Sequence, residues 1–249
     1  MTPVKLLSFL MLLTPGFAHA QDWSDDWSGR VTLYGWLTAA EIDSRVPLRG
    51  GGSLDSSVSA GIGDILQSLD FAAFANAEVR RGRFLLLGDL MYAKLSTDGT
   101  GAAGASVKTG LKTFIGTGAV GWQFWSNDRA RFDVFGGARI VSTEIDVARR
   151  GLLTAQSGSD SQTFVDPLIG LRAGYQLTDR IELRGSADVG GFGVGSDFSW
   201  EAFVGGSYGF TERIRGELGF RYLSIDYKNN GVAVDMELYG PTIGLSVVF

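Results

Sequence analysis

The chain has 249 residues, among them 36 glycines and no cysteine, and its formal charge at pH 7 is −5. The lack of cysteine excludes disulfide bridges and thiolate sites, and the acidic balance argues against nucleic acid as a partner, because nucleic-acid binding needs a basic surface. The mean hydropathy of +0.10 is too low for a bundle of membrane helices, while the glycine content is about twice the usual value.

The beginning of the chain is organised like a secretory signal peptide, residues 1–20. One basic residue, Lys5, precedes an apolar stretch at 6–13, and Ala18-His19-Ala20 forms an A-x-A cleavage site. The apolar stretch is shorter than the ~20 residues of a membrane helix. We therefore expect export, cleavage before Gln21 and one domain from there to residue 249.

Catalysis is not expected. His19 is the one histidine of the sequence, so the exported chain would have none and could not form a Ser-His or Asp-His relay. A carboxylate pair would need one partner kept protonated, and neighbouring arginines favour the ionised form instead. The sequence predicts neither an enzyme nor a cofactor, and no metal site.

Ten segments alternate apolar and polar side chains with the period of two of a β-strand. In the clearest, Val165, Ile169 and Leu171 share one face and Asp166 and Arg172 the other. The expected strands lie at about 27–39, 69–79, 84–95, 107–125, 130–147, 165–177, 181–189, 198–210, 214–222 and 239–249. Because only a closed barrel satisfies strand backbone groups in lipid, the pattern predicts an all-β, antiparallel transmembrane barrel of about ten strands, with eight or twelve as alternatives.

The last strand favours an outer-membrane barrel over a soluble sandwich. It ends on an aromatic residue, which resembles the signal by which Gram-negative outer-membrane barrels are recognised for assembly. The residues of this expected assembly signal are Tyr239, Ile243, Leu245, Val247 and Phe249. The resemblance implies the barrel-assembly machinery and periplasmic chaperones as partners during biogenesis, and outer-membrane lipid afterwards.

The connections between the expected strands alternate in length. Short turns follow the second, fourth, sixth and eighth strands, and an Asn-Gly hairpin turn is expected at 228–231. Long loops are expected at about 40–68, 96–106 and 148–162. Short turns at one end and long loops at the other are typical of outer-membrane barrels, whose short turns are periplasmic.

Four further features favour structural roles over functional ones. The glycine-rich run 190–195 is followed by a strand, so we expect a hairpin rather than a phosphate-binding loop. Apolar residues at helical spacing in 62–69 predict a short helix, on the surface rather than in the mouth. Asp22, Asp25 and Asp26 could bind calcium, but a solvated terminus is favoured. Interfacial girdles, rather than carbohydrate stacking, are expected for the tryptophans Trp23, Trp27, Trp122, Trp125 and Trp200.

Charged side chains are expected to fill the lumen. By alternation, eight arginines and eight carboxylates point inward: Arg30, Arg80, Arg131, Arg139, Arg172, Arg184, Arg215 and Arg221, with Glu78, Asp89, Asp133, Asp166, Glu182, Asp188, Glu201 and Glu217. In a narrow bore these groups should pair, which favours a plugged barrel over a conducting pore. Lumen-facing Gly170 is expected to tolerate serine far better than lipid-facing Leu171 tolerates arginine.

Several stretches resemble a largely uncharacterised family of proteobacterial outer-membrane barrels. They are Gly88–Tyr92, Phe164–Arg172, Gly190–Asp197, Gly219–Tyr227 and Leu238–Pro241. The resemblance implies the barrel class, and a looser likeness to small porins and opacity-type surface proteins rests on pattern alone. The expected function is a structural or surface-interaction barrel without catalysis. The alternative is a small passive channel for polar solutes or a small apolar ligand.

Overall fold

A computed structural model describes residues 27–47, 53–100, 106–150, 155–229 and 232–249. The strands in these residues are β1 Trp27–Trp36, β2 Ala39–Pro47, β3 Ser53–Ala60, β4 Leu69–Arg81, β5 Phe84–Thr100, β6 Ser106–Ser126, β7 Ala130–Arg150, β8 Ala155–Gln176, β9 Ile181–Gly190, β10 Phe198–Gly209, β11 Ile214–Asn229 and β12 Val232–Val248. The helix is α1, Ile62–Ser68. Within this part of the chain, no helix has both the length and the apolar composition needed to cross a bilayer.

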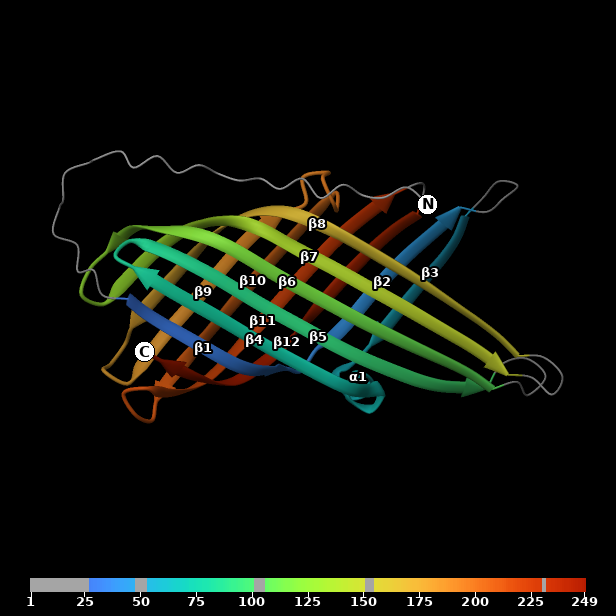
Figure 1. Ribbon diagram of the computed structural model, residues 1–249, viewed down its shortest axis with the longest axis horizontal. Helices are drawn as coiled ribbons and strands as arrows, with labels where there is room; N and C mark the ends of the chain where they lie inside the picture. Colours follow the sequence, from blue (N-terminus) through green and yellow to red (C-terminus); the bar gives the residue numbers. More distant parts are fainter. Residues whose placement is uncertain (1–26, 48–52, 101–105, 151–154, 230–231) are drawn as a thin grey trace.

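The strands form one closed antiparallel barrel (Figure 1). From β1 the wall runs through β4 and then in chain order to β12, which pairs back with β1. β12 also pairs with β2 through its N-terminal half, and β3 pairs with β2 as β4 pairs with β1. β1 and β2 therefore share one wall position, and β3 and β4 share the next. The strands of the described residues thus occupy ten positions, which confirms the expected ten-stranded barrel.

The break between β1 and β2 depends on a close backbone approach. Trp36 donates its indole N–H to the Gly240 carbonyl oxygen at 3.2 Å, and the Leu37 N–H bonds the Pro241 carbonyl at 2.9 Å. A Cβ atom on Gly240 would lie 1.9 Å from the Leu37 carbonyl oxygen. Only glycine fits at this point, and the expected first strand therefore ends at Trp36 instead of continuing to Ala39.

One end of the barrel has the short turns that the sequence indicates, and the C-terminus lies at this end (Figure 1). Three of the turns share a device: a side-chain oxygen accepts the backbone N–H groups two and three residues later. Asn127, Thr178 and Thr211 are these acceptors, at distances of 2.7–3.3 Å. Such side chains replace a backbone turn and fix its geometry.

At the other end the expected long loops are wrong. β2, β3 and α1 occupy most of 40–68, while β5 to β8 continue through most of 96–106 and 148–162. The antiparallel register runs unbroken into these segments, as in Lys94↔Lys112↔Glu144. The long connections are strands because each of them pairs with a neighbouring strand along at least one edge, which satisfies the backbone groups on that edge. The hairpin expected at 228–231 lies partly outside the described residues.

The half of the wall nearest the short turns has the polarity of a membrane barrel. Outward apolar side chains are exposed, among them Leu171 at 58%, Leu218 at 65% and Leu245 at 60%. The exposed residues of the expected assembly signal, Ile243, Leu245, Val247 and Phe249, lie on this face. Alternation thus places an apolar surface against lipid around the barrel. We call this part the membrane band.

Aromatic side chains flank the membrane band. Trp27, Trp122 and Trp125 lie near the short turns, and the Trp122 ring packs edge-on against Phe84 at 4.7 Å between centroids. At the opposite boundary Trp200, Tyr222 and Tyr239 form a stacked row, with centroid separations of 4.7 and 5.9 Å. These positions match interfacial girdles. Trp23 lies outside the described residues.

Beyond the Trp200 row the polarity of the wall inverts. In β6 and β7, Lys112 and Glu144 point outward, whereas Leu111 and Ile145 point inward. The β2–β3 hairpin repeats this arrangement, with charged outer side chains and apolar inner ones such as Val58. These segments form two projecting lobes. One consists of the parts of β5 to β8 that lie farthest from the short turns, and the other of β2 and β3 with the adjoining ends of β11 and β12.

The lobes separate where neighbouring strands are shorter. The β8–β9 ladder ends at Leu168↔Gly190, and the β4–β5 ladder begins at Leu69↔Leu95. α1 lies beside β2, β3 and β5 and buries none of its residues, so the expected surface helix is confirmed. Both lobes extend beyond the level of β9 and β10 (Figure 1).

Candidate functional site

The candidate site is the interior of the barrel, where inward side chains form layers. The layer nearest the short turns is charged and, after the expected side of these turns, is called the periplasmic cluster. Arg30 and Arg131 each bind Glu182 at 2.6 Å, and Arg184 contacts Glu217. The salt bridges join β1, β7, β9 and β11, so this layer ties distant wall positions together.

The rest of the periplasmic cluster crosses from β4 to β7 and β8. Arg80 binds Asp133 through both terminal nitrogens, at 3.0 and 2.6 Å, and it binds Glu78 at 2.6 Å. The second carboxylate oxygen of Glu78 accepts from Arg172 at 2.5 Å. Bidentate guanidinium–carboxylate pairs combine charge with fixed geometry, and they hold these long side chains across the bore.

A second charged layer, the outer cluster, lies farther from the short turns. Arg139 binds Asp188 at 2.9 Å and Glu201 at 3.0 Å, and Arg221 binds Glu201 at 2.8 Å. Arg221 also binds Asp89 at 3.1 Å. Arg139 and Glu201 are at most 9% exposed, so these charges rely on one another instead of on water.

Tyr34 completes the outer cluster. Its hydroxyl donates to Asp89 at 3.0 Å and accepts from Arg221 at 2.7 Å. The Arg221 guanidinium lies 5.3 Å from the centroid of the Trp36 ring, in a cation–π arrangement. The outer cluster thus connects the charged interior to the apolar residues above it.

Two members of the expected lumen set have other roles. Asp166 accepts the Ser196 backbone N–H at 2.6 Å and its hydroxyl at 2.7 Å. This contact anchors the hairpin after β9, where Gly191 and Phe192 have positive φ angles of 86° and 50°, and β10 follows as a strand. Arg215 donates to Ser207 at 3.0 Å and to the Arg180 carbonyl at 3.1 Å. All the other expected lumen residues form salt bridges.

Apolar layers alternate with the charged ones. Ala119, Phe135 and Leu168 pack together, and on β7 Phe135 lies between Asp133 of the periplasmic cluster and Arg139 of the outer cluster. Beyond the outer cluster lies an apolar plug: Trp36, Met91, Ile115, Val141, Leu223 and Ile225, with Tyr34, Phe74, Phe164, Met236 and Leu238 packed against it. Sequence reasoning missed this plug. The signal that could have revealed it is that the inward-facing positions become apolar at the strand ends farthest from the short turns.

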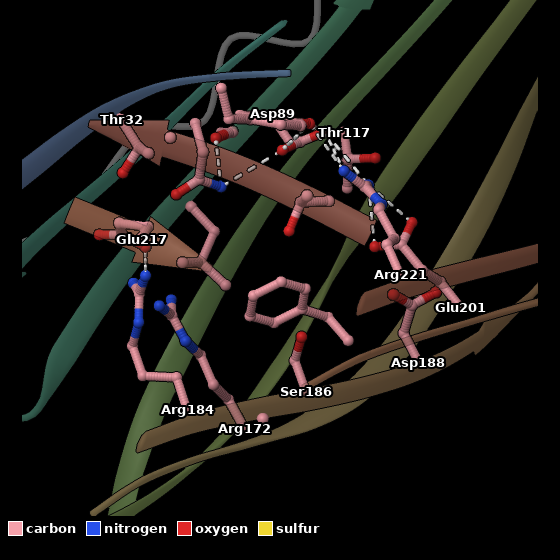
Figure 2. Close-up of a pocket in the computed structure, with 18 of the residues that line it drawn as sticks. Thr32, Asp89, Thr117, Arg172, Arg184, Ser186, Asp188, Glu201, Glu217 and Arg221 are labelled. Carbon is pink, nitrogen blue, oxygen red and sulfur yellow. Dashed lines mark hydrogen bonds and ion pairs between the residues drawn. The ribbon is translucent and has the colours of Figure 1, made fainter. Parts of the chain in front are cut away.

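A chamber of about 140 Å³ lies inside the lumen and contacts both charged clusters (Figure 2). Arg172, Arg184 and Glu217 line it from the periplasmic cluster, and Asp188 and Arg221 line it from the outer cluster. A chamber of this volume, with charged side chains in its lining, is large enough to hold a few water molecules. It is a small widening between two charged layers.

The interior is tightly packed around Gly170. A Cβ atom at Gly170 would lie 2.4 Å from the Phe135 ring and 2.6 Å from the Ala187 carbonyl oxygen. Serine therefore does not fit at Gly170 without movement of the backbone. The apolar layer around Phe135 fills the space beside Gly170, and the expected ranking, in which Leu171→Arg costs more than Gly170→Ser, stays a prediction.

Ion pairing determines what the interior can do chemically. Each carboxylate of the two clusters contacts at least one guanidinium. Within the described residues, no group of three or more metal-ligating side chains is arranged to hold a metal ion. The suggested calcium ligands Asp22, Asp25 and Asp26 lie outside these residues. The arrangement is suited to closing the bore.

Comparison with known proteins gives the fold and a family match. Residues 94–232, more than half of the chain, match the model of a family described as “Protein of unknown function, DUF481”. A search of curated proteins gave no match.

Solved structures give the same fold. The outer membrane protease OmpT from Escherichia coli aligns with a TM-score of 0.59 and 13% identity, over 92% of this chain and 99% of that one. A Pseudomonas aeruginosa FadL homologue (TM-score 0.37, 12% identity, 90% of each chain) and Ail of Yersinia pestis (0.34, 12%, 89% and 99%) are more distant. The chain has the fold of an integral outer-membrane β-barrel.

Proposed function

The chain belongs to the DUF481 family, whose function is unknown, and from that premise we propose a non-enzymatic outer-membrane barrel with a closed lumen and projecting lobes that contact partners outside the cell. The family supplies no activity, so the argument rests on the interior and the lobes.

The observation that carries the proposal is the sequence of layers across the bore. A solute moving along the axis would have to pass the periplasmic cluster, the layer around Phe135, the outer cluster and the apolar plug. Breaking a buried ion pair leaves an uncompensated charge, which costs about 3–5 kcal/mol. Opening the charged layers would therefore require several such losses together.

The projecting lobes support a role in surface contacts. They continue the barrel wall as regular strands beyond the aromatic row at Trp200, and their outer faces carry salt bridges such as Lys112–Glu144. Their inner faces keep apolar side chains exposed, among them Val58 at 55% and Ile145 at 45%. The lobes therefore offer partners a charged outer face and an apolar inner face. Both faces are built on hydrogen-bonded strands, which are more rigid than loops.

The absence of catalysis remains part of the proposal. OmpT is a protease, but an alignment at 13% identity shows the fold alone. The one histidine of the sequence, His19, lies in the expected signal peptide. The carboxylates of the lumen are paired with arginines. No combination of nucleophile and base is therefore expected in the exported chain.

Planar-bilayer recording tests the closed lumen. We expect a very low or intermittent conductance for the refolded barrel. Arg184→Ser and Arg172→Ser should raise it, because each removes a side chain that lines the chamber. Arg45→Ser is the matched control, since Arg45 pairs with Asp55 on the exposed β2–β3 hairpin. A large, steady conductance that none of the variants changes would favour the alternative, a small passive channel.

Location and orientation can be tested with single cysteines, because the chain has none of its own. A membrane-impermeant maleimide should label Asp55→Cys on the hairpin of intact cells, and Glu212→Cys, on a short turn, only after lysis. Fractionation should place the protein in the outer membrane, with heat-modifiable migration and cleavage before Gln21. Labelling of both positions in intact cells would contradict the orientation, and recovery from the soluble periplasm would contradict the membrane location.

A further inference from the structure

A groove lies on the outer face of the membrane band, away from the lumen. Its volume is about 1090 Å³, and it crosses β10, β11, β12 and β1. Outward apolar side chains form its walls, among them Leu33, Leu245 and Tyr208. These residues face lipid in the closed barrel, so the groove opens toward the bilayer and not toward water.

Glycines make the floor of the groove. Gly206, Gly216 and Gly35 occupy outward positions between exposed apolar neighbours on β10, β11 and β1. The rings of Tyr208 and Phe210, in edge contact at 5.5 Å between centroids, stand at one side. The missing side chains at Gly206 and Gly35, between large apolar neighbours, leave a concave surface for a flexible hydrocarbon chain, and the Phe210 ring lies against Gly216.

The groove begins beside two short turns. Ile181 and Phe210 line it, and they lie directly next to the turns that join β8 to β9 and β10 to β11. Hydrogen bonds join these turns: the Arg180 carbonyl oxygen accepts the Gly209 N–H at 2.8 Å and the Arg215 guanidinium at 3.1 Å. The groove therefore lies in the periplasmic half of the membrane band.

Each of these turns ends on an exposed arginine. Arg180 follows Thr178-Asp179, and Arg213 follows Thr211-Glu212, while the hydroxyl of each threonine fixes the turn. Guanidinium groups bind phosphate through paired, charge-assisted hydrogen bonds. Two arginines at the end of an apolar groove thus match the two chemical parts of a phospholipid.

We propose that this groove binds one phospholipid of the periplasmic leaflet, with its phosphate at Arg180 and Arg213 and its acyl chains over Gly206. Binding at this surface is independent of whether the lumen conducts. The turns and the glycine floor belong to neighbouring strands, so a bound lipid would span the wall where β12 closes onto β1.

Native mass spectrometry of the intact barrel, purified in mild detergent and supplied with phosphatidylethanolamine, tests the proposal. We expect one retained lipid per barrel. Gly206→Leu should fill the groove, and it fits the wall because the nearest atoms to a Cβ there lie at 3.4 and 3.5 Å. Arg180→Gln with Arg213→Gln should weaken retention about tenfold through loss of the phosphate contacts.

The chain offers a matched control for each change. Gly118→Leu makes the same substitution on the lipid face of β6, outside the groove, where nothing lies within 4 Å of an added Cβ. Arg129→Gln removes the corresponding arginine from the β6–β7 turn. Both controls should retain lipid as the unchanged barrel does, and heat-modifiable migration verifies that every variant is folded.

Three outcomes would overturn the proposal. Equal retention by the groove variants and their controls would mean that lipid binds without the groove. Retention of lipid A in place of phosphatidylethanolamine would mean that the occupant comes from the outer leaflet. A lipid-free dimer lost in Gly206→Leu would mean that the groove receives a second copy of the chain.

Discussion

The membrane band and the projecting lobes use the same strands with opposite polarity. On β8, Leu171 points outward in the band and is 58% exposed, while Ser159 points outward in the lobe. Inward positions change in the other direction, from Arg139 in the band to Ile145 in the lobe on β7. One continuous ladder thus crosses a boundary between two solvents. Alternation fixes which residues share a face, but the solvent decides what each face must be.

The largest expected effect contrasts a buried ion pair with an exposed one. Arg139→Met removes the arginine partner of Asp188 and one of the two arginine partners of Glu201, while both carboxylates stay buried, and should lower the free energy of unfolding by about 3–5 kcal/mol. Arg45→Met breaks an equally short pair with Asp55, whose side chains are 66% and 62% exposed, and should change little. Denaturant unfolding in lipid vesicles measures both. Similar losses would mean that the lumen is hydrated like the lobes.

The next contrast places arginine on the outer face of one strand at two levels. Leu171→Arg should cost about 2–4 kcal/mol if the residue lies at the bilayer midplane. Ser159→Arg should cost little, because Ser159 is exposed beyond the aromatic row and pairs in register with Asp146. The same unfolding measurement applies. If Ser159→Arg were the more harmful change, the boundary between band and lobe would be misplaced.

Added volume should separate the two regions as well. Gly170→Ser in the band interior should cost about 1–3 kcal/mol through overpacking against Phe135. Gly110→Ser in the lobe should be tolerated, since the nearest atom to a Cβ there, on Asp146, lies at 3.7 Å. Midpoints of thermal unfolding would rank the two variants. An unchanged midpoint for Gly170→Ser would show that the side chains around Phe135 can move to make room for the serine.

The smallest expected effect is on the outer face of a lobe. Hydrogen bonds to Glu144 and Asp146 raise the pKa of Lys112. Because the folded pKa is raised, any stabilisation is present below the usual lysine pKa and is lost only as the pH rises through the raised value. Lys112→Gln should unfold like the unchanged barrel at pH 7, since exposed pairs contribute little. A clear loss of unfolding free energy at neutral pH would mean that the ion pairs of the lobe stabilise the fold as those of the lumen do.

Much of the barrel could be predicted from alternation along single strands. Because side chains alternate between the two faces of each strand, the sequence alone places Arg139, Glu201 and Arg221 inward. It places Leu171 and Phe249 outward for the same reason. Alternation along a strand could not show that Arg80 binds Asp133, or that Asp166 binds a hairpin instead of an arginine. Partners depend on the register between strands, and register is not visible in one strand at a time.

The sequence by itself determined a closed barrel with an apolar outer face and a charged interior, because backbone pairing and a period of two leave no other arrangement for such strands in lipid. Only the tertiary structure decided that the strands continue past the membrane with inverted polarity and that an apolar plug around Trp36 and Leu223 caps the charged clusters. The reason is physical: the apolar inner residues of the outer strand ends look like lipid-facing residues until closure of the wall brings them together.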